Sequence, residues 1–133
     1  MAIILDADVI ICAEKGTFDV GAWLASRRDE LFEVAAITVA ELWHGVERAT
    51  EPHKSRRREF LQAILAVLPI VPYTEQTAYE HARIWAELQS AGKIIGAYDL
   101  IVAATAVERG SQVATFNRRH FSAVKGLRII VPS

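Results

Sequence analysis

The sequence has a single cysteine, Cys12, among 133 residues. One cysteine can form neither an internal disulfide nor a zinc site built from cysteines, and this scarcity favours a reducing compartment. No apolar run reaches the ~20 residues that span a bilayer. The apolar start at residues 2–5 is followed at once by Asp6 and Asp8, with no basic leader before it. We therefore expect a cytoplasmic protein with no membrane association.

The phosphate-binding and nucleophile motifs of several large enzyme classes are also missing. The chain contains no G-x-G-x-x-G segment and no Walker-type glycine loop that ends in Lys-Ser or Lys-Thr, which are the phosphate cradles of dinucleotide-binding and P-loop proteins. It also lacks the G-x-S-x-G elbow of serine hydrolases. Neither sign of charge is in excess, since 15 Lys and Arg residues face 16 Asp and Glu residues. A polyanionic partner would therefore require a local basic patch.

The sequence does contain enough apolar material for a folded core. Hydrophobic residues make up 52% of the chain and charged residues 23%, which is not the composition of a disordered segment. The length suits a single domain, residues 1–133, and we find no linker, repeat or low-complexity segment. Short apolar runs bounded by polar residues, Pro or Gly predict buried strands at residues 2–5, 35–37, 69–71, 112–115 and 128–131.

Helical patterns separate these expected strands. Gly92 and Gly110 follow the last two patterns, as helix-ending glycines commonly do. Strands that alternate with helices predict right-handed crossovers and a parallel sheet. We therefore expect an α/β fold, a three-layer α/β/α domain with a mainly parallel central sheet. Apolar residues recur at helical spacing within residues 38–48, 60–68, 73–90 and 98–109.

Two carboxylates follow the first expected strand. Asp6 comes directly after this strand and Asp8 lies two residues later, and ligands of open parallel sheets bind beyond the carboxyl ends of the strands. A carboxylate pair at this place could hold a hard cation such as Mg²⁺. The alternative is that one of the two caps the helix that starts near Val9. The pair favours the cation, because a cap needs only one carboxylate and the second adds charge repulsion.

Glu41 lies in the first turn of an expected helix and has two interpretations. Thr38 and Glu41 have the spacing of a capping box, in which the Glu side chain returns to the N-cap amide. Gly45, four residues later, favours a functional role for Glu41. Glycine within a helix costs ~1 kcal/mol relative to alanine and usually serves close approach or space beside it.

Asp99 and Asn117 are ambiguous when each is considered alone. Asp99 opens an apolar helix, where it suits an N-cap or a first-turn acid favoured by the helix dipole. Asn117 follows an expected strand, where a turn is the simpler role. Asp6 and Asn117 thus follow strands, while Glu41 and Asp99 begin helices. In a parallel α/β fold these positions share one edge of the sheet, so we expect the four side chains to gather there.

Basic residues occur in clusters within residues 27–28, 54–58 and 118–119. Such clusters are usually solvated helix faces or turns. Arg118 and Arg119 are the exception that we favour, because they adjoin Asn117 at the expected acidic edge. Guanidinium groups at that place could hold a phosphate backbone.

Four short segments contain these candidate residues, in order and at suitable spacing. They are Ile4-Leu-Asp6-Ala-Asp8-Val-Ile10, Thr38-Val-Ala-Glu41-Leu-Trp-His-Gly45, Ile95-Gly-Ala-Tyr-Asp99-Leu-Ile-Val-Ala-Ala104 and Ala114-Thr-Phe-Asn117-Arg-Arg-His-Phe121. On these segments the chain resembles the PIN-domain endoribonucleases, specifically the VapC-type toxins of bacterial and archaeal toxin–antitoxin pairs. The resemblance extends over nearly the whole chain and implies a PIN-like fold.

By this resemblance, Asp6, Glu41 and Asp99 look like the acidic triad that holds Mg²⁺ or Mn²⁺, directly or through water. Asp6 and Asp99 are the metal ligands that it implies, and Asn117 is a further catalytic residue. The implied chemistry is metal-assisted hydrolysis of RNA phosphodiester bonds. The cation lowers the pKa of a bound water, orients it in line with the scissile phosphate and neutralises charge on the phosphate oxygens. Glu41 or Asp99 would help to orient that water.

The sequence departs from the fuller family pattern around Asn117. Many relatives place a fourth Asp in this segment, whereas this chain has Asn117 and, three residues later, His120. The departure implies a weakened second metal site. Thr115 and Asp8 are expected to support the cluster, and Asp8 stands where the family often has Asn, so its extra charge compensates in part.

The same resemblance implies three kinds of partner. They are an RNA substrate, which Arg118 and Arg119 would help to bind, a second copy of the chain in a homodimer formed through helical faces, and a cognate antitoxin protein. The antitoxin would block the site in a toxin–antitoxin hetero-oligomer. None of these partners follows from composition or spacing.

Two other functions stay open. A D-x-D segment after the first strand also begins phosphotransferases of the haloacid dehalogenase type, where the first Asp attacks phosphorus and the second is the general acid. Such a phosphatase needs a later Lys and a further acidic pair, and neither Lys93 nor Lys125 has that context. The third function is a catalytically silent module that holds RNA or a partner through its basic patches.

Overall fold

Five short strands form the central sheet of the computed structural model, which describes residues 2–133. Their order across the sheet is β3-β2-β1-β4-β5, and every pair of neighbours is parallel. β1 therefore lies at the centre, and the carboxyl ends of all five strands lie at one edge. The strands are β1 (Ala2–Leu5), β2 (Leu31–Ala35), β3 (Ile70–Val71), β4 (Gln112–Ala114) and β5 (Ile129–Ile130).

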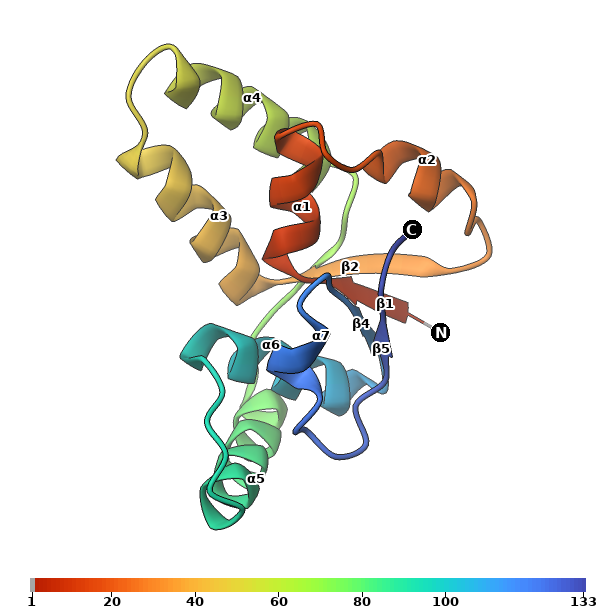
Figure 1. Cartoon of the computed structure of the whole chain (residues 1–133), viewed down its shortest axis with the longest axis vertical. Coiled ribbons are helices and arrows are strands. Elements are labelled where there is room, and N and C mark those ends of the chain that lie inside the picture. The colour runs from red at the N-terminus through yellow and green to blue at the C-terminus, as the bar shows by residue number, and fades with distance from the viewer. Residues whose placement is uncertain (1) are drawn as a thin grey trace.

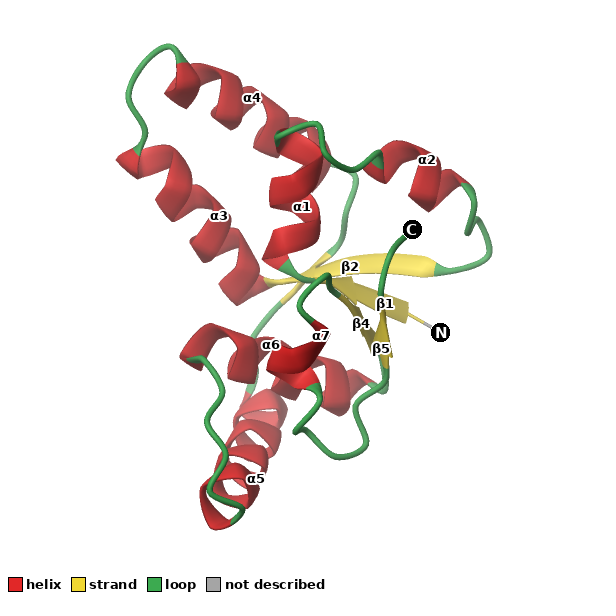
Figure 2. Cartoon of the chain, in the orientation of Figure 1, coloured by secondary structure: helices red, strands yellow, loops and turns green. Residues whose placement is uncertain are grey.

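Helices cover both faces of this sheet (Figures 1 and 2). One layer contains α1 to α4 and the other contains α5 to α7, which confirms the predicted α/β/α architecture and its parallel sheet. The part of the chain that the structure describes has no helix long and apolar enough to cross a membrane. The helices are α1 (Ala7–Glu14), α2 (Val20–Ala25), α3 (Ala36–Arg48), α4 (His53–Leu65), α5 (Glu75–Ser90), α6 (Ala97–Arg109) and α7 (Arg118–Phe121).

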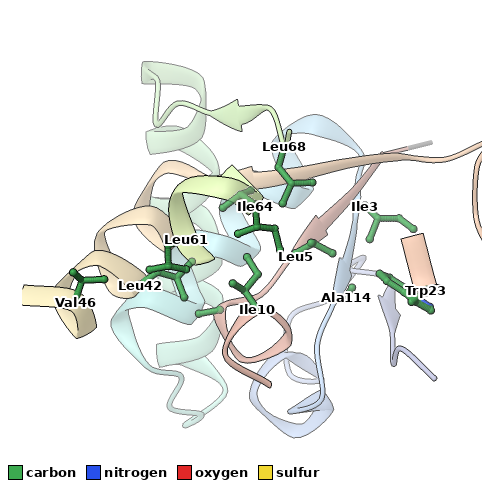
Figure 3. Packing of buried hydrophobic residues seen from close by; sticks show 12 residues of the cluster. Ile3, Leu5, Ile10, Trp23, Leu42, Val46, Leu61, Ile64, Leu68 and Ala114 are labelled. Carbon is green, nitrogen blue, oxygen red and sulfur yellow. The ribbon is translucent and has the colours of Figure 1, made fainter. Parts of the chain in front are cut away.

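The alternation of side chains along β1 divides the hydrophobic core into two parts. Ile3 and Leu5 point into a cluster with α1 to α4, whereas Ile4 points into a cluster with α5 to α7. All three side chains are fully buried. In Figure 3, Leu61 lies beside Leu42, and Ile10 and Ile64 lie nearer to Leu5 of this strand. Because both faces are covered, the strand is apolar at consecutive positions.

One strand prediction was wrong. Residues 35–37 were expected to be a strand, but β2 ends at Ala35, and the next two residues form the first turn of α3. The true strand contains the buried Glu33, whose carboxylate forms an ion pair with Arg109 at 2.6 Å. A charged residue in the middle of a buried strand interrupts the apolar pattern on which the strand prediction depends. The sequence pattern therefore did not reveal the full extent of β2. The short helices α2 and α7 were also not predicted.

The helix ends agree well with the sequence. Gly92 and Gly110 have φ values of 67° and follow α5 and α6. Only glycine adopts this backbone conformation readily, so both positions end their helices as expected. α3 follows β2 with no intervening loop, and it contacts α6. These connections bring the first turns of α1, α3 and α6 towards one edge of the sheet.

Candidate active site

Asp6 lies at the carboxyl end of β1 and is nearly fully buried. Its Oδ1 accepts a hydrogen bond from the backbone N–H of Ala7 at 2.9 Å, so Asp6 is the N-cap of α1. Its Oδ2 accepts a hydrogen bond from Thr115 Oγ at 2.9 Å, which ties β1 to β4. Burial raises the pKa of Asp6, and the nearby Asp99 carboxylate raises it further. The capping role that the sequence suggested is therefore real, but it occupies only one oxygen.

Asp8 turns towards the segment between β4 and α7. Its Oδ2 accepts hydrogen bonds from the backbone N–H of Phe116 at 3.0 Å and from Asn117 Nδ2 at 2.9 Å. The Thr115 hydroxyl lies 3.3 Å from the same oxygen and accepts a bond from the Asn117 N–H at 2.9 Å. Burial raises the pKa of Asp8 to about 6, with a contribution from the Asp6 charge. Asp8 therefore holds Asn117 next to the acidic residues.

Glu41 is not held in a capping box. α3 begins at Ala36, three residues earlier than the box requires, and has no side-chain cap. Glu41 therefore lies in the second turn of α3 and not in the first, as was expected. Thr38 Oγ and Glu41 Oε1 are both buried, and neither has a hydrogen-bond partner among the described residues. Burial, together with the charges of Asp6, Asp99 and Asp8, raises the pKa of Glu41 to about 7. The capping interpretation is therefore wrong, and the Glu41 carboxyl lies within electrostatic range of the other acids.

Asp99 lies in the first turn of α6, three residues after the N-cap Gly96. It is therefore a first-turn acid and not the cap itself. Its Oδ2 lies 3.1 Å from His120 Nδ1. Burial raises the pKa of Asp99, His120 lowers it, and the Asp8 charge raises it. In the sequence, His120 stood out only as a departure from the family pattern. In the structure, its position in α7 places its ring next to the Asp99 carboxylate.

The structure thus brings four carboxyl groups together without a Lys or Arg among the groups that shift their pKa values. Within residues 2–133, no three His, Cys, Asp or Glu side chains converge closely enough to form a ready-made metal site. The unpartnered Oε1 of Glu41 and the mutual repulsion nevertheless suit a divalent cation. Mg²⁺ prefers carboxylate oxygens and usually keeps several waters, so the ligands need not all touch it.

A cleft of about 760 Å³ opens beside Asp99. One wall is formed by residues 94–96, which precede α6, and the other by residues 116–120. Arg118 and Arg119 line the second wall and are exposed. The two arginines are therefore next to the acidic cluster, on the helix that Asp8 and Asn117 anchor.

Comparison with known proteins agrees with this fold. The model of the PIN domain family matches residues 3–127. The chain is 37% identical to "VapC ribonuclease Y4jK" of Sinorhizobium fredii, over 98% of this chain and 96% of the relative. It is 33% identical to "tRNA(fMet)-specific endonuclease VapC" of Salmonella typhimurium, over 72% and 71%. DNA-bound VapBC from Salmonella typhimurium has a similar structure, with a TM-score of 0.90 at 26% identity over 98% of both chains.

The chain belongs to the PIN-domain family. Within this family it is a VapC-type ribonuclease, the toxin of a toxin–antitoxin system. The phosphatase interpretation of Asp6 and Asp8 is therefore set aside.

Proposed function

We propose that the protein is an Mg²⁺- or Mn²⁺-dependent endoribonuclease whose site is formed by Asp6, Glu41 and Asp99. The observation that carries this proposal is the state of Glu41. Its Oε1 is buried without a partner, and its pKa is raised to about 7 by burial and by three neighbouring carboxylates. Such a cluster is unfavourable by itself and becomes favourable when a divalent cation neutralises it.

Each residue of the site would have its own role in phosphodiester hydrolysis. When bound, the cation supplies a water of lowered pKa and positive charge for the phosphate oxygens. Asp6 and Asp99 would hold the cation through carboxylate oxygens. The N-cap occupies one oxygen of Asp6, and Thr115 orients the other. Glu41 orients the attacking water through its unpartnered oxygen. Asn117 contacts the substrate from the position in which Asp8 holds it.

The RNA substrate would bind in the cleft beside Asp99. Arg118 and Arg119 line this cleft, and neither forms an ion pair with a described residue. A guanidinium group that has no protein carboxylate is available for a phosphate. The two arginines would therefore hold the RNA backbone next to the acidic cluster.

A second copy of the chain would bind to an aromatic face of α5. Tyr73 OH lies 2.8 Å from His81 Nδ1, and the His81 ring stacks on Trp85 with centroids 5.8 Å apart. Trp85 is nevertheless 53% exposed. Exposed aromatic groups of this kind are typical of interfaces. Trp85→Glu should convert a dimer to a monomer in light scattering, whereas Tyr79→Glu, another exposed aromatic of α5, should not.

A cognate antitoxin protein is the remaining partner. The solved structures that this chain resembles include toxin–antitoxin complexes, such as VapBC from Salmonella typhimurium. We propose that an antitoxin covers the acidic cluster in a hetero-oligomer and that the pair acts in the cytoplasm.

The proposal is tested by incubating the purified protein with single-stranded and structured RNAs in Mg²⁺, Mn²⁺ or EDTA. An Asp6→Asn, Asp99→Asn double variant, checked for folding by circular dichroism, controls for contaminating nucleases. We expect cleavage that needs the metal and is lost in the folded variant. Equal cleavage by both proteins would overturn the proposal. Mn²⁺ binding without cleavage of any RNA would favour a silent binding module.

A further inference from the structure

A second cleft, of about 540 Å³, lies at the carboxyl end of α5. Its floor is apolar and includes Ile84, Leu88 and Val124, which are buried. Lys93 and Lys125 stand at its walls and are exposed. The cleft therefore combines an apolar floor with two positive charges.

This cleft and the one beside Asp99 lie between the same two segments of the chain. Lys93 lines the α5 cleft and the next residue, Ile94, lines the Asp99 cleft. On the opposite wall, His120 lines the Asp99 cleft and Ala123 the α5 cleft. Figure 1 shows both segments in the layer of α5 to α7. The two clefts thus follow one another from the acidic cluster to the end of α5, and we call them together the lower groove.

The lysine and arginine side chains along the lower groove are unpaired. Lys93 and Lys125 form no ion pair with a described residue, and the same holds for the two arginines at the other end. Glu87, an acid that lines the α5 cleft, is paired with Arg83 at 2.9 Å. Elsewhere in this layer, Arg109 is paired with Glu33. Unpaired cations are therefore left along the groove.

We propose that the lower groove binds the sugar–phosphate backbone of the substrate RNA beyond the nucleotides at the acidic cluster. This inference rests on the proposed ribonuclease function and extends its binding site. Lys93 and Lys125 bind phosphates, while the apolar floor receives a base or ribose. An apolar floor can be used only by a base that is not paired, so the bound segment is single-stranded. Continuity with the catalytic cleft and charge complementarity both favour RNA as the occupant.

The test compares a Lys93→Ala, Lys125→Ala variant with an Arg56→Ala, Arg58→Ala variant of α4. Both remove two positive charges, but Arg56 and Arg58 lie in the opposite layer. Each pair is placed in an Asp6→Asn background, and binding of a fluorescent, non-cleavable 2′-O-methyl RNA is followed by anisotropy. The RNA has about twelve nucleotides, within the usual range of single-strand sites. The midpoint of urea unfolding checks that both variants are folded.

We expect the lysine variant to bind this RNA about tenfold more weakly. The slope of log K against log salt concentration should also be shallower, by the amount expected for the loss of about one phosphate contact or more. A short RNA of about three nucleotides, which stays at the acidic cluster, should bind both variants equally. Equal weakening in the two variants, or none in the lysine variant, would overturn the inference. Weaker binding of an acidic peptide with unchanged RNA binding would also overturn it, because the groove would then serve a protein partner.

The failure of this inference can be told apart from the failure of the proposed function. Binding is measured without cleavage, so an unaffected lysine variant rejects the lower groove even if the wild-type protein cleaves RNA. Absence of metal-dependent cleavage by the wild-type protein rejects the nuclease, whatever the lysines do.

Discussion

Asn117 donates a hydrogen bond from Nδ2 to Oδ2 of Asp8 at 2.9 Å, across 109 positions of the sequence. The same Asp8 oxygen accepts the backbone N–H of Phe116. One carboxylate therefore fixes the start of α7, the helix that carries Arg118 and Arg119 into the cleft beside Asp99. This relationship distinguishes Asp8, which positions a segment, from Asp6, Glu41 and Asp99, which we propose as the metal site.

The first prediction concerns Asp8→Ala and Asp8→Asn. The alanine variant leaves the Phe116 N–H without its acceptor, so this amide should exchange with solvent faster, and RNA cleavage should fall about tenfold, which corresponds to the loss of about one hydrogen bond. The asparagine variant keeps an oxygen acceptor at this position. We expect it to retain most of the amide protection and most of the activity, measured by hydrogen exchange and by initial cleavage rates.

The control for this prediction is the affinity for Mn²⁺, measured by calorimetry. If Asp8 acts by positioning the segment around Asn117 and not by binding the metal, Asp8→Ala should change this affinity by less than about threefold, which is ~0.7 kcal/mol. If both variants lose activity equally and bind Mn²⁺ weakly, then Asp8 acts through its charge and the positional role is wrong.

The second prediction concerns the pH dependence of stability without metal. The pKa of Glu41 is raised from 4.5 to about 7 in the folded protein. Between these values the folded state holds a proton that the unfolded chain has lost, so the free energy of unfolding decreases as the pH rises through this window. Asp8, with a pKa of about 6, contributes in the same direction. The protein should therefore be more stable at the acid end of the window.

Glu41→Gln isolates this effect from the other titrating groups. The advantage of the variant over the wild type should be greater at about pH 7.5 than at about pH 5.5, by about 1 kcal/mol or less, since Glu41 is only partly buried and solvent screens its charge. Urea unfolding in EDTA measures both proteins at both pH values. A stability difference that is the same at the two pH values would contradict the raised pKa.

The third prediction concerns the ion pair between Glu33 and Arg109. The Glu33 side chain is only 10% exposed, and Arg109 donates to both of its carboxylate oxygens, at 2.6 and 3.2 Å. Arg109→Ala leaves this charge unpaired within β2 and should lower the free energy of unfolding by about 3 kcal/mol. Adding Glu33→Val, which removes the stranded charge, should restore much of the loss in urea unfolding. A double variant as unstable as the single one would show that the pair does not account for the loss.

The fourth prediction concerns Gly45, which the sequence suggested was needed for space beside Glu41. A Cβ at this position would lie 3.6 Å from the nearest atom, Arg57 Nη1, at an ordinary contact distance. Gly45→Ala should therefore be accommodated and should stabilise α3 by about 0.5–1 kcal/mol, because alanine favours the helix. The unfolding midpoint in urea measures this change.

Gly45→Leu provides the comparison for this substitution. Its larger side chain would meet Arg57, which binds the Gly45 carbonyl at 3.2 Å and Glu14 at 2.7 Å. We expect the leucine variant to be less stable than the alanine variant. Destabilisation by alanine itself would mean that the space beside Gly45 is required after all.

The sequence by itself determined the parallel α/β architecture and the places of Asp6 and Asp99. Both results depend on local signals, namely short apolar runs, helical spacing and polar residues directly after a strand or in the first turn of a helix. In a parallel sheet these local positions reach one edge whatever the details of packing. Gly92 and Gly110 are equally local, since a positive φ at the end of a helix needs no distant partner.

Only the tertiary structure decided the rest. β2 contains Glu33, whose burial depends on Arg109, 76 positions away. Glu41 is free because α3 starts at Ala36 and leaves the expected capping box unformed. Asp8 turns to Asn117 and not to solvent because β1 and β4 are neighbours in the sheet. The physical reason is the same in each case: the partner of a buried polar group is chosen by the packing of distant segments, and no local pattern records it.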